Sequence, residues 1–238
     1  MRIFRRTRGL GLMALWAFAP AVVVQTDPTT GGLSFSVGGG RGEFSRVVRG
    51  CSGELLEEDL IPFTGFGMRA EYEENRMRAT VFGGKVSQDE GVAIEDPIDG
   101  RGSGYFGGQV AYEGHTAGVG LGFAQYASRE EGLLPSLYLR IGPRERVSAV
   151  FDLLPPTTMP GVTGLVRGGI SFRKTGGLGG LVGFQGTRPF DDNEGWGPVV
   201  ELHHPVSDHM GLDLGGSVQF GSEGPTDWGF GLGLTVTP

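Results

Sequence analysis

The chain has 238 residues with a formal net charge of −7, and 46 of the residues are glycine. The glycines have no Gly-X-Y period and 38% of the residues are hydrophobic, which excludes a collagen-like chain and argues against a disordered one. The acidic balance argues against nucleic acid as a partner, because phosphate binding needs clustered Lys and Arg. The single cysteine, Cys51, cannot form a disulfide within the chain.

The N-terminal segment has the pattern of a secretory signal peptide. Its start is basic, an apolar stretch runs from Leu10 to Val24, and Ala19-Pro20-Ala21 offers small residues for cleavage. The apolar stretch is short for a membrane-spanning helix, which needs about 20 apolar residues. We therefore expect a signal peptide over residues 1–21, a linker over 22–31, and one β-domain over 32–238.

Alternation with period two recurs through the remaining chain, which is the mark of strands with two different faces. In the stretch 115–127, Val119, Leu121 and Phe123 alternate with glycine or small residues. The preceding stretch 106–113 alternates in the same way. A two-residue turn at Gly114-His115 would pair these stretches, with Val110 opposite Val119 and Phe106 opposite Phe123.

A second hairpin is expected around the polar turn Glu73-Glu74-Asn75-Arg76. Its strands alternate apolar and polar residues from Phe66 to Tyr72 and from Met77 to Val81. The expected register sets Glu71 opposite Arg78 as a cross-strand ion pair. Helical periodicity is weak, with room for one short turn over 54–60.

The whole pattern predicts about twelve strands, with ten as the alternative, and an even number is typical of bacterial barrels. We expect the strands at 32–39, 63–73, 76–84, 103–113, 116–126, 135–142, 147–153, 163–173, 177–186, 197–203, 209–220 and 227–236.

The predicted connections alternate in length along the chain. Short turns are expected near 74–75, 114–115, 143–146, 174–176 and 204–208. Long, mostly acidic connections are expected near 40–62, 85–102, 127–134, 154–162, 187–196 and 221–226. Barrels of outer membranes have short periplasmic turns and long external loops, and in such barrels the apolar face of each strand meets lipid.

On these features the chain resembles the class of bacterial outer-membrane β-barrels over nearly all of residues 32–238. It differs from many of them by ending on Leu234-Thr235-Val236-Thr237-Pro238 instead of an aromatic residue. The resemblance implies an all-β, antiparallel up-and-down transmembrane barrel in the cell outer membrane of a Gram-negative-type envelope. The implied role is a porin-like channel or a structural barrel with a polar, Gly-rich lumen. Outer-membrane lipid and lipopolysaccharide are the implied partners, and a small solute is the ligand a channel would carry.

Charged residues on the polar faces are the candidates to line that lumen, where they would tune ion selectivity or form ion pairs. They are Arg69, Glu71, Arg78, Glu113, Arg140, Asp152, Arg167, Glu201 and Asp213. Because both signs occur, the sequence predicts neither strong anion nor strong cation selectivity.

Other candidate sites are weaker. The residues His203, His204, Asp208 and His209 are types that bind transition metals, but Pro205 suggests a tight turn there. The acidic loop residues Asp191, Asp192 and Glu194 are candidates to bind a divalent ion or bridge through one to lipopolysaccharide.

No cofactor or catalytic site is expected. A lipase-like hydrolase using Ser207 and His203 is one alternative, although no G-x-S-x-G motif is present. A secreted or periplasmic soluble β-domain with a binding role is the other alternative.

Overall fold

The computed structural model describes residues 32–49, 55–88, 103–126, 133–158, 166–173, 177–186, 195–221 and 226–238, with side chains left out at 44–49, 55–59, 61, 88, 103 and 126. The predicted signal peptide and linker at 1–31 lie outside the described residues. Within the described ranges, no helix is long and apolar enough to cross a membrane.

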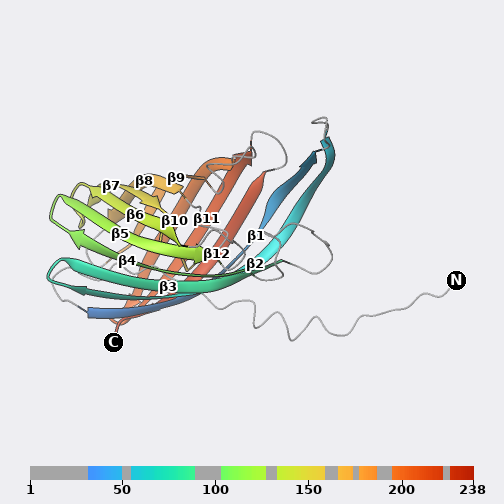
Figure 1. The fold of residues 1–238 in the computed structure, drawn as a ribbon. Coiled ribbons are helices and arrows are strands. Elements are labelled where there is room, and N and C mark those ends of the chain that lie inside the picture. The colour runs from blue at the N-terminus through green and yellow to red at the C-terminus, as the bar shows by residue number, and fades with distance from the viewer. Residues whose placement is uncertain are drawn as a thin grey trace, which may run out of the picture.

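The twelve predicted strands are confirmed, and they form one closed antiparallel barrel (Figure 1). In chain order they are β1 (Gly32–Arg49), β2 (Leu55–Glu74), β3 (Met77–Gln88), β4 (Ser103–Glu113), β5 (Ala117–Tyr126), β6 (Leu134–Ile141), β7 (Val147–Leu153), β8 (Val166–Arg173), β9 (Gly179–Gly186), β10 (Gly195–Ser207), β11 (Met210–Gly221) and β12 (Asp227–Val236). Each strand pairs with its neighbours in sequence, and β1 pairs with β12 to close the sheet.

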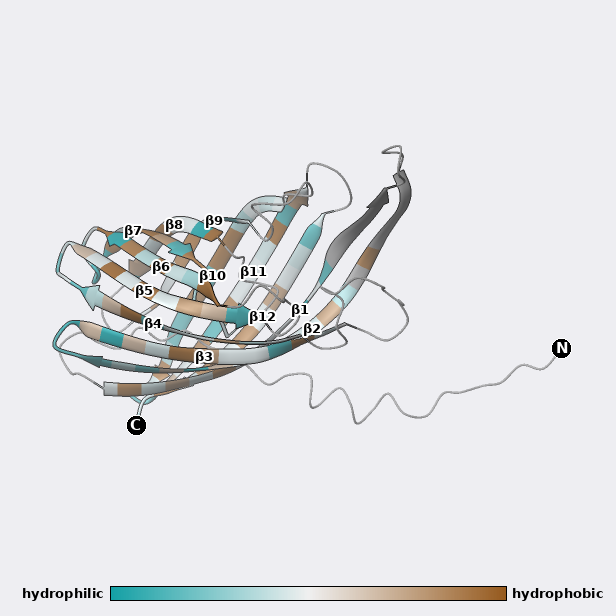
Figure 2. Cartoon of the chain, viewed as in Figure 1, coloured by the Kyte–Doolittle hydropathy of each residue, from teal (hydrophilic) through white to brown (hydrophobic). Residues whose placement is uncertain are grey.

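Side chains alternate between an apolar outer surface and a more polar interior, and Figure 2 shows this as alternating colours along the strands. The outward side chains of Val119, Leu121 and Phe123 are 48%, 68% and 41% exposed. Inward polar residues are buried instead; Gln109 and Thr80 are each 3% exposed. An apolar outer surface around a closed sheet is the arrangement of outer-membrane barrels.

Both predicted hairpin registers are wrong by two residues. Val110 lies opposite Leu121, because Glu113 pairs with Gly118 and four residues, 114–117, lie between them instead of two. In the other hairpin, Glu71 lies opposite Thr80 and Glu73 lies opposite Arg78. A shift of two residues keeps every side chain on its predicted face, since the period of a strand is two.

The second of these turns is tighter than expected. Glu74 and Met77 are the last paired residues, so the turn consists of Asn75 and Arg76. Both have positive φ values, 50° and 68°, as a type I′ hairpin turn requires.

The β1–β2 hairpin also differs from the prediction. Residues 55–60 belong to β2 instead of a helical turn, and β1 continues to Arg49, so the long connection expected at 40–62 is reduced to 50–54. Past Glu43, β1 goes on pairing with β2 after its pairing with β12 has ended. The β1–β2 hairpin therefore rises above the rest of the barrel (Figure 1).

Many inward glycines lie where neighbouring backbone leaves no room for a side chain. A Cβ added at Gly84 would lie 2.2 Å from the Phe66 carbonyl oxygen and 2.6 Å from the Tyr105 hydroxyl. A Cβ added at Gly168 of β8, which faces outward opposite Phe151, would have the Val150 carbonyl oxygen at 3.9 Å as its nearest neighbour. The glycine excess thus partly reflects close packing inside the barrel.

We expect Gly84→Ala to lower the free energy of unfolding by about 1–3 kcal/mol, the usual cost of overpacking. The matched change Gly168→Ala should leave stability unchanged or slightly higher, because alanine restricts the unfolded chain. Urea unfolding followed by tryptophan fluorescence measures both. Equal effects of the two changes would contradict the packing argument.

Candidate functional site

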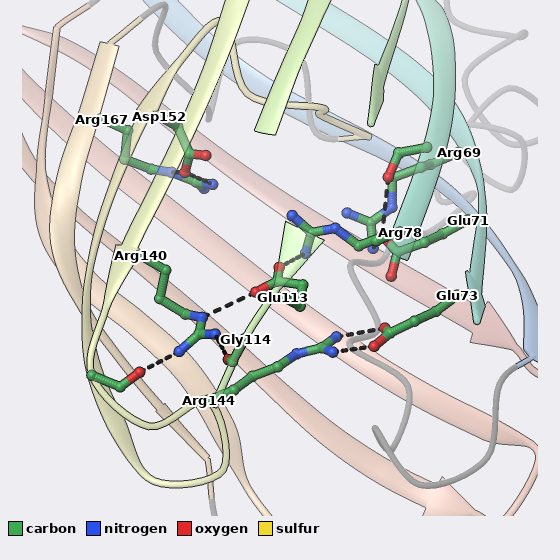
Figure 3. A network of polar contacts seen from close by, with 12 residues as sticks. Arg69, Glu71, Glu73, Arg78, Glu113, Gly114, Arg140, Arg144, Asp152 and Arg167 are labelled. Carbon is green, nitrogen blue, oxygen red and sulfur yellow. Dashed lines mark hydrogen bonds and ion pairs between the residues drawn. The ribbon is translucent and has the colours of Figure 1, made fainter. Parts of the chain in front are cut away.

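The candidate site is the lumen, where the structure places the charged side chains of the polar strand faces. All nine predicted lumen residues take inward positions: Arg69, Glu71, Arg78, Glu113, Arg140, Asp152, Arg167, Glu201 and Asp213. Seven of them are at most 7% exposed, and the side chains of Arg167 and Glu201 are 12% and 14% exposed. Most of them pair with one another instead of standing apart, and Figure 3 shows Glu113 between Arg78 and Arg140, and Asp152 beside Arg167. Asp213 pairs with His203 instead.

Glu113, at the end of β4, links two arginines from other strands. Its carboxylate lies 3.1 Å from the Arg78 guanidinium of β3 and accepts a 3.1 Å hydrogen bond from Arg140 Nε of β6. Arg140 also donates to the carbonyls of Gly114 and Gly142, so it joins two turns (Figure 3). The predicted pair of Glu71 and Arg78 is replaced by this cluster.

The Arg78 guanidinium also lies over an aromatic ring. It sits 4.6 Å from the centroid of Tyr138, which is a cation–π distance. Since Arg78 and Glu113 are almost fully buried, each charge depends on its neighbours to offset the loss of water.

A further pair, Glu73 and Arg144, was not among the predicted lumen residues. Arg144 belongs to the β6–β7 turn and reaches inward to bind the Glu73 carboxylate through both of its terminal nitrogens, one of them at 2.7 Å. Glu73 could have been found from its parity with Arg69 and Glu71 on β2. Arg144 could not, because no alternation extends into a turn.

The other side of the lumen carries two more groups. Arg167 of β8 binds Asp152 of β7 at 2.8 Å and Glu201 of β10 at 2.6 Å. His203 Nδ1 of β10 lies 2.6 Å from Asp213 Oδ1 on β11, the residue directly opposite it. Charged side chains thus project into the lumen from strands all around the barrel.

The connection after β7 enters the barrel, contrary to the external loop expected at 154–162. Leu154 has a φ of +51°, and it packs against Phe82, Tyr105 and Ala124 inside the barrel. Ser136 Oγ donates to the Leu154 carbonyl at 3.0 Å. We call residues 154–158 the inner segment.

The inner segment crosses the lumen to the opposite wall. Tyr105 Oη donates to the Thr157 carbonyl at 3.3 Å, and Thr158 is fully buried. A Cβ added at Gly67 of β2 would lie 3.0 Å from the Thr158 Cα, so this glycine makes room for the segment. Because β2 lies across the barrel from β7 and β8, the inner segment narrows the lumen.

A chamber of about 120 Å³ lies among these groups. Its walls include Arg69, Glu71, Tyr138, Glu201, Asp213 and, from the inner segment, Pro156. Within the described part of the chain, Tyr138 Oη, Glu71 Oε1 and Asp213 Oδ2 are buried without a hydrogen-bond partner. Since buried polar atoms are normally hydrogen-bonded, the chamber suits water or a small polar solute.

Comparison with known proteins found solved structures of low similarity to this chain. Solved structures similar to this chain include Neisserial surface protein A (NspA), with a TM-score of 0.32 and 10% identity over 86% of this chain and 96% of that one. The outer membrane protease OmpT from Escherichia coli has a TM-score of 0.23 and 9% identity over 91% of this chain and 99% of that one. No family model matches the chain, and no curated protein matches it.

The chain folds as an outer-membrane type of β-barrel. This statement rests on the closed sheet and its apolar outside, and the compared structures assign no activity to it.

The histidine cluster is not brought together. His203 faces the lumen and His204 faces outward, since β10 extends through Pro205 to Ser207 instead of turning at 204–208. Asp208 and His209 form the exposed turn, where His209 Nδ1 lies 3.0 Å from the Thr237 carbonyl oxygen. Among the described residues, no group of three or more His, Cys, Asp or Glu is placed to hold a metal ion.

Two further sets of candidates have different outcomes. Asp191, Asp192 and Glu194 lie outside the described residues. Ser207 and His203 are the pair of the hydrolase alternative, and the structure does not show them in contact. Ser207 is exposed beside the turn, whereas His203 points into the lumen toward Asp213.

We expect Glu113→Ala to lower the free energy of unfolding by about 3–5 kcal/mol, because it leaves Arg78 and Arg140 buried without their shared carboxylate. Glu145→Ala removes the same charge from an exposed turn position and should change stability by less than about 0.5 kcal/mol. Denaturant midpoints of the two variants in lipid vesicles give the comparison. A Glu113→Ala variant as stable as the control would show that the cluster is not coupled.

Proposed function

We propose that the protein is an outer-membrane β-barrel whose lumen is closed, and that it serves as a structural barrel in the cell envelope. The observation that carries the proposal is the contrast between the two faces of one closed sheet. Leu121, Ile141 and Phe184 are 68%, 72% and 66% exposed on the outside, while charged residues are buried inside. In water this arrangement would expose a continuous apolar surface, whereas in a bilayer it faces lipid.

The ends of the barrel support an orientation. Five connections at one end are short: 75–76, 114–116, 142–146, 174–178 and 208–209. The opposite end carries the longer ones at 89–102, 154–165 and 187–194, together with the extended β1–β2 hairpin. By the usual rule for such barrels, the short turns face the periplasm and the other end faces outward.

The closed lumen is supported by two layers of side chains. Toward the periplasmic end, the Glu113 cluster and the Glu73–Arg144 pair fill the interior with buried ion pairs. Toward the outer end, Phe82, Tyr105 and Leu154 form an apolar layer with the inner segment. A porin instead keeps a water-filled path with exposed charges.

A narrow, solute-selective channel is the second candidate. The chamber of about 120 Å³ favours it, because its walls hold buried polar atoms of both donor and acceptor type and reach Arg173 and Gly179 beside the short 174–178 turn. Such a channel would require the inner segment or the ion pairs to move. The soluble β-domain is disfavoured by the exposed apolar surface. We assign the chain no catalytic role, and esterase activity that disappears in Ser207→Ala would contradict this.

The membrane assignment predicts a depth-dependent cost for a charge on the outer surface. Leu121→Arg, in the middle of β5, should destabilise the barrel by about 2–4 kcal/mol, and Ile141→Arg, at the end of β6, by about 0–1 kcal/mol. Unfolding in vesicles measures the difference. The wild type should also fractionate with membranes, resist extraction without detergent and migrate differently on gels when unheated. Release into the soluble fraction would refute the proposal.

The closed lumen predicts that the purified wild-type barrel gives no steady discrete conductance in planar bilayers. An outer-membrane porin inserted under the same conditions is the control for insertion and detection. Discrete conductance steps from the wild type would contradict the closed barrel and favour the channel. In that case, the double change Glu73→Gln and Arg144→Gln should alter the step size, because this pair lies in the periplasmic layer.

A further inference from the structure

The outer surface of the barrel carries charge at one place between its rims. Across the described outward positions of the twelve strands, the residues are otherwise apolar, glycine or uncharged, apart from Glu74 next to a turn. The exceptions are Arg41 and Glu43 on β1 and Lys85 on β3. A charge on a lipid-facing surface is tolerated near the interface or beside a partner, so this cluster marks a place where the outer surface meets polar groups.

The two cations flank the same stretch of β2. Arg41 lies opposite Thr64 and Lys85 lies opposite Phe66, so the two residues stand on either side of this strand. Both are exposed. Strands in a sheet are spaced about 4.8 Å apart, which separates the two backbones by about 10 Å across β2. Their long side chains can therefore reach the same or neighbouring groups of one bound molecule.

Glu43 and Trp228 mark the depth of this cluster. Trp228 Nε1 donates a 2.8 Å hydrogen bond to Glu43 Oε2, and tryptophan side chains gather at membrane interfaces. This hydrogen bond draws the Glu43 carboxylate toward β12, on the side of β1 away from Lys85. Arg41 lies two residues before Glu43 on the same outer face of β1, about 7 Å along the strand toward the middle of the membrane. Its guanidinium can extend back to the headgroup level, as long cationic side chains do.

We propose that Arg41 and Lys85 bind the phosphate groups of a phosphorylated glycolipid of the outer leaflet, the lipid A part of lipopolysaccharide. The inference rests on the proposed outer-membrane location, because it takes the end with the longer connections as external. Charge complementarity selects a phosphate, for which arginine is a bidentate donor. Phe66 and Met68 lie on β2, between the two cations and on the periplasmic side of them. Their side chains are 48% and 57% exposed and offer an apolar surface to the acyl chains.

The test measures lipid binding by the purified full barrel in detergent micelles. The probes are bis-phosphorylated lipid A, lipid A without its phosphates, and phosphatidylglycerol. The wild type should bind bis-phosphorylated lipid A at least about tenfold more tightly than the dephosphorylated form, as expected for two charge-assisted contacts. The double variant Arg41→Ser and Lys85→Ser should lose most of this preference.

A matched control removes two cations from the opposite rim. Arg76→Ser with Arg146→Ser changes exposed turn residues at the short-connection end, so it alters the net charge equally and should keep the preference. Heat-modifiable gel migration verifies that each variant is folded. Equal loss in both double variants, or tighter binding of phosphatidylglycerol than of lipid A, would overturn the proposed site. A barrel that fails to fractionate with membranes would instead refute the proposed function on which it rests.

Discussion

Pairing of β1 with β12 is the constraint on which the rest of the structure depends. It closes the sheet, so every strand has a neighbour on both sides, and only the tip of the β1–β2 hairpin extends past its outer neighbours. Only a closed sheet can present an apolar surface to hydrocarbon, because an unpaired backbone group there would cost several kcal/mol. Closure therefore permits the outer face to be apolar, and alternation then directs the polar side chains inward.

Inward charges create a second requirement, since each must be compensated away from bulk water. The barrel meets it by joining charges from different strands: Glu113 holds Arg78 and Arg140, and Arg167 holds Asp152 and Glu201. Buried ion pairs contribute little net stability compared with apolar packing, but an incorrect pairing leaves an unpaired charge. We therefore interpret the network as selecting one register of the barrel and filling its interior.

The inside and the outside of the barrel thus have separate roles. Inside, the inner segment and the ion pairs fill much of the lumen and leave a small chamber that reaches the strand ends at Arg173 and Gly179. Outside, the described strand residues between the rims are almost uniformly apolar, and the charged ones among them lie on β1 and β3 near the outer rim. The residues that we propose to recognise a ligand, Arg41 and Lys85, therefore lie on the lipid-facing surface and not in the lumen.

The sequence by itself indicated about twelve strands, most of their approximate bounds and the inward face of the nine lumen candidates, because a period of two survives a shift of two residues. It did not determine which charges meet. Glu113 reaches Arg140 across β5, a contact that depends on the curvature and stagger of the closed sheet. Nor did it indicate that Arg144 turns inward or that the inner segment crosses to Gly67. Alternation describes strands alone, so the paths of turns and connections were decided by packing inside the barrel.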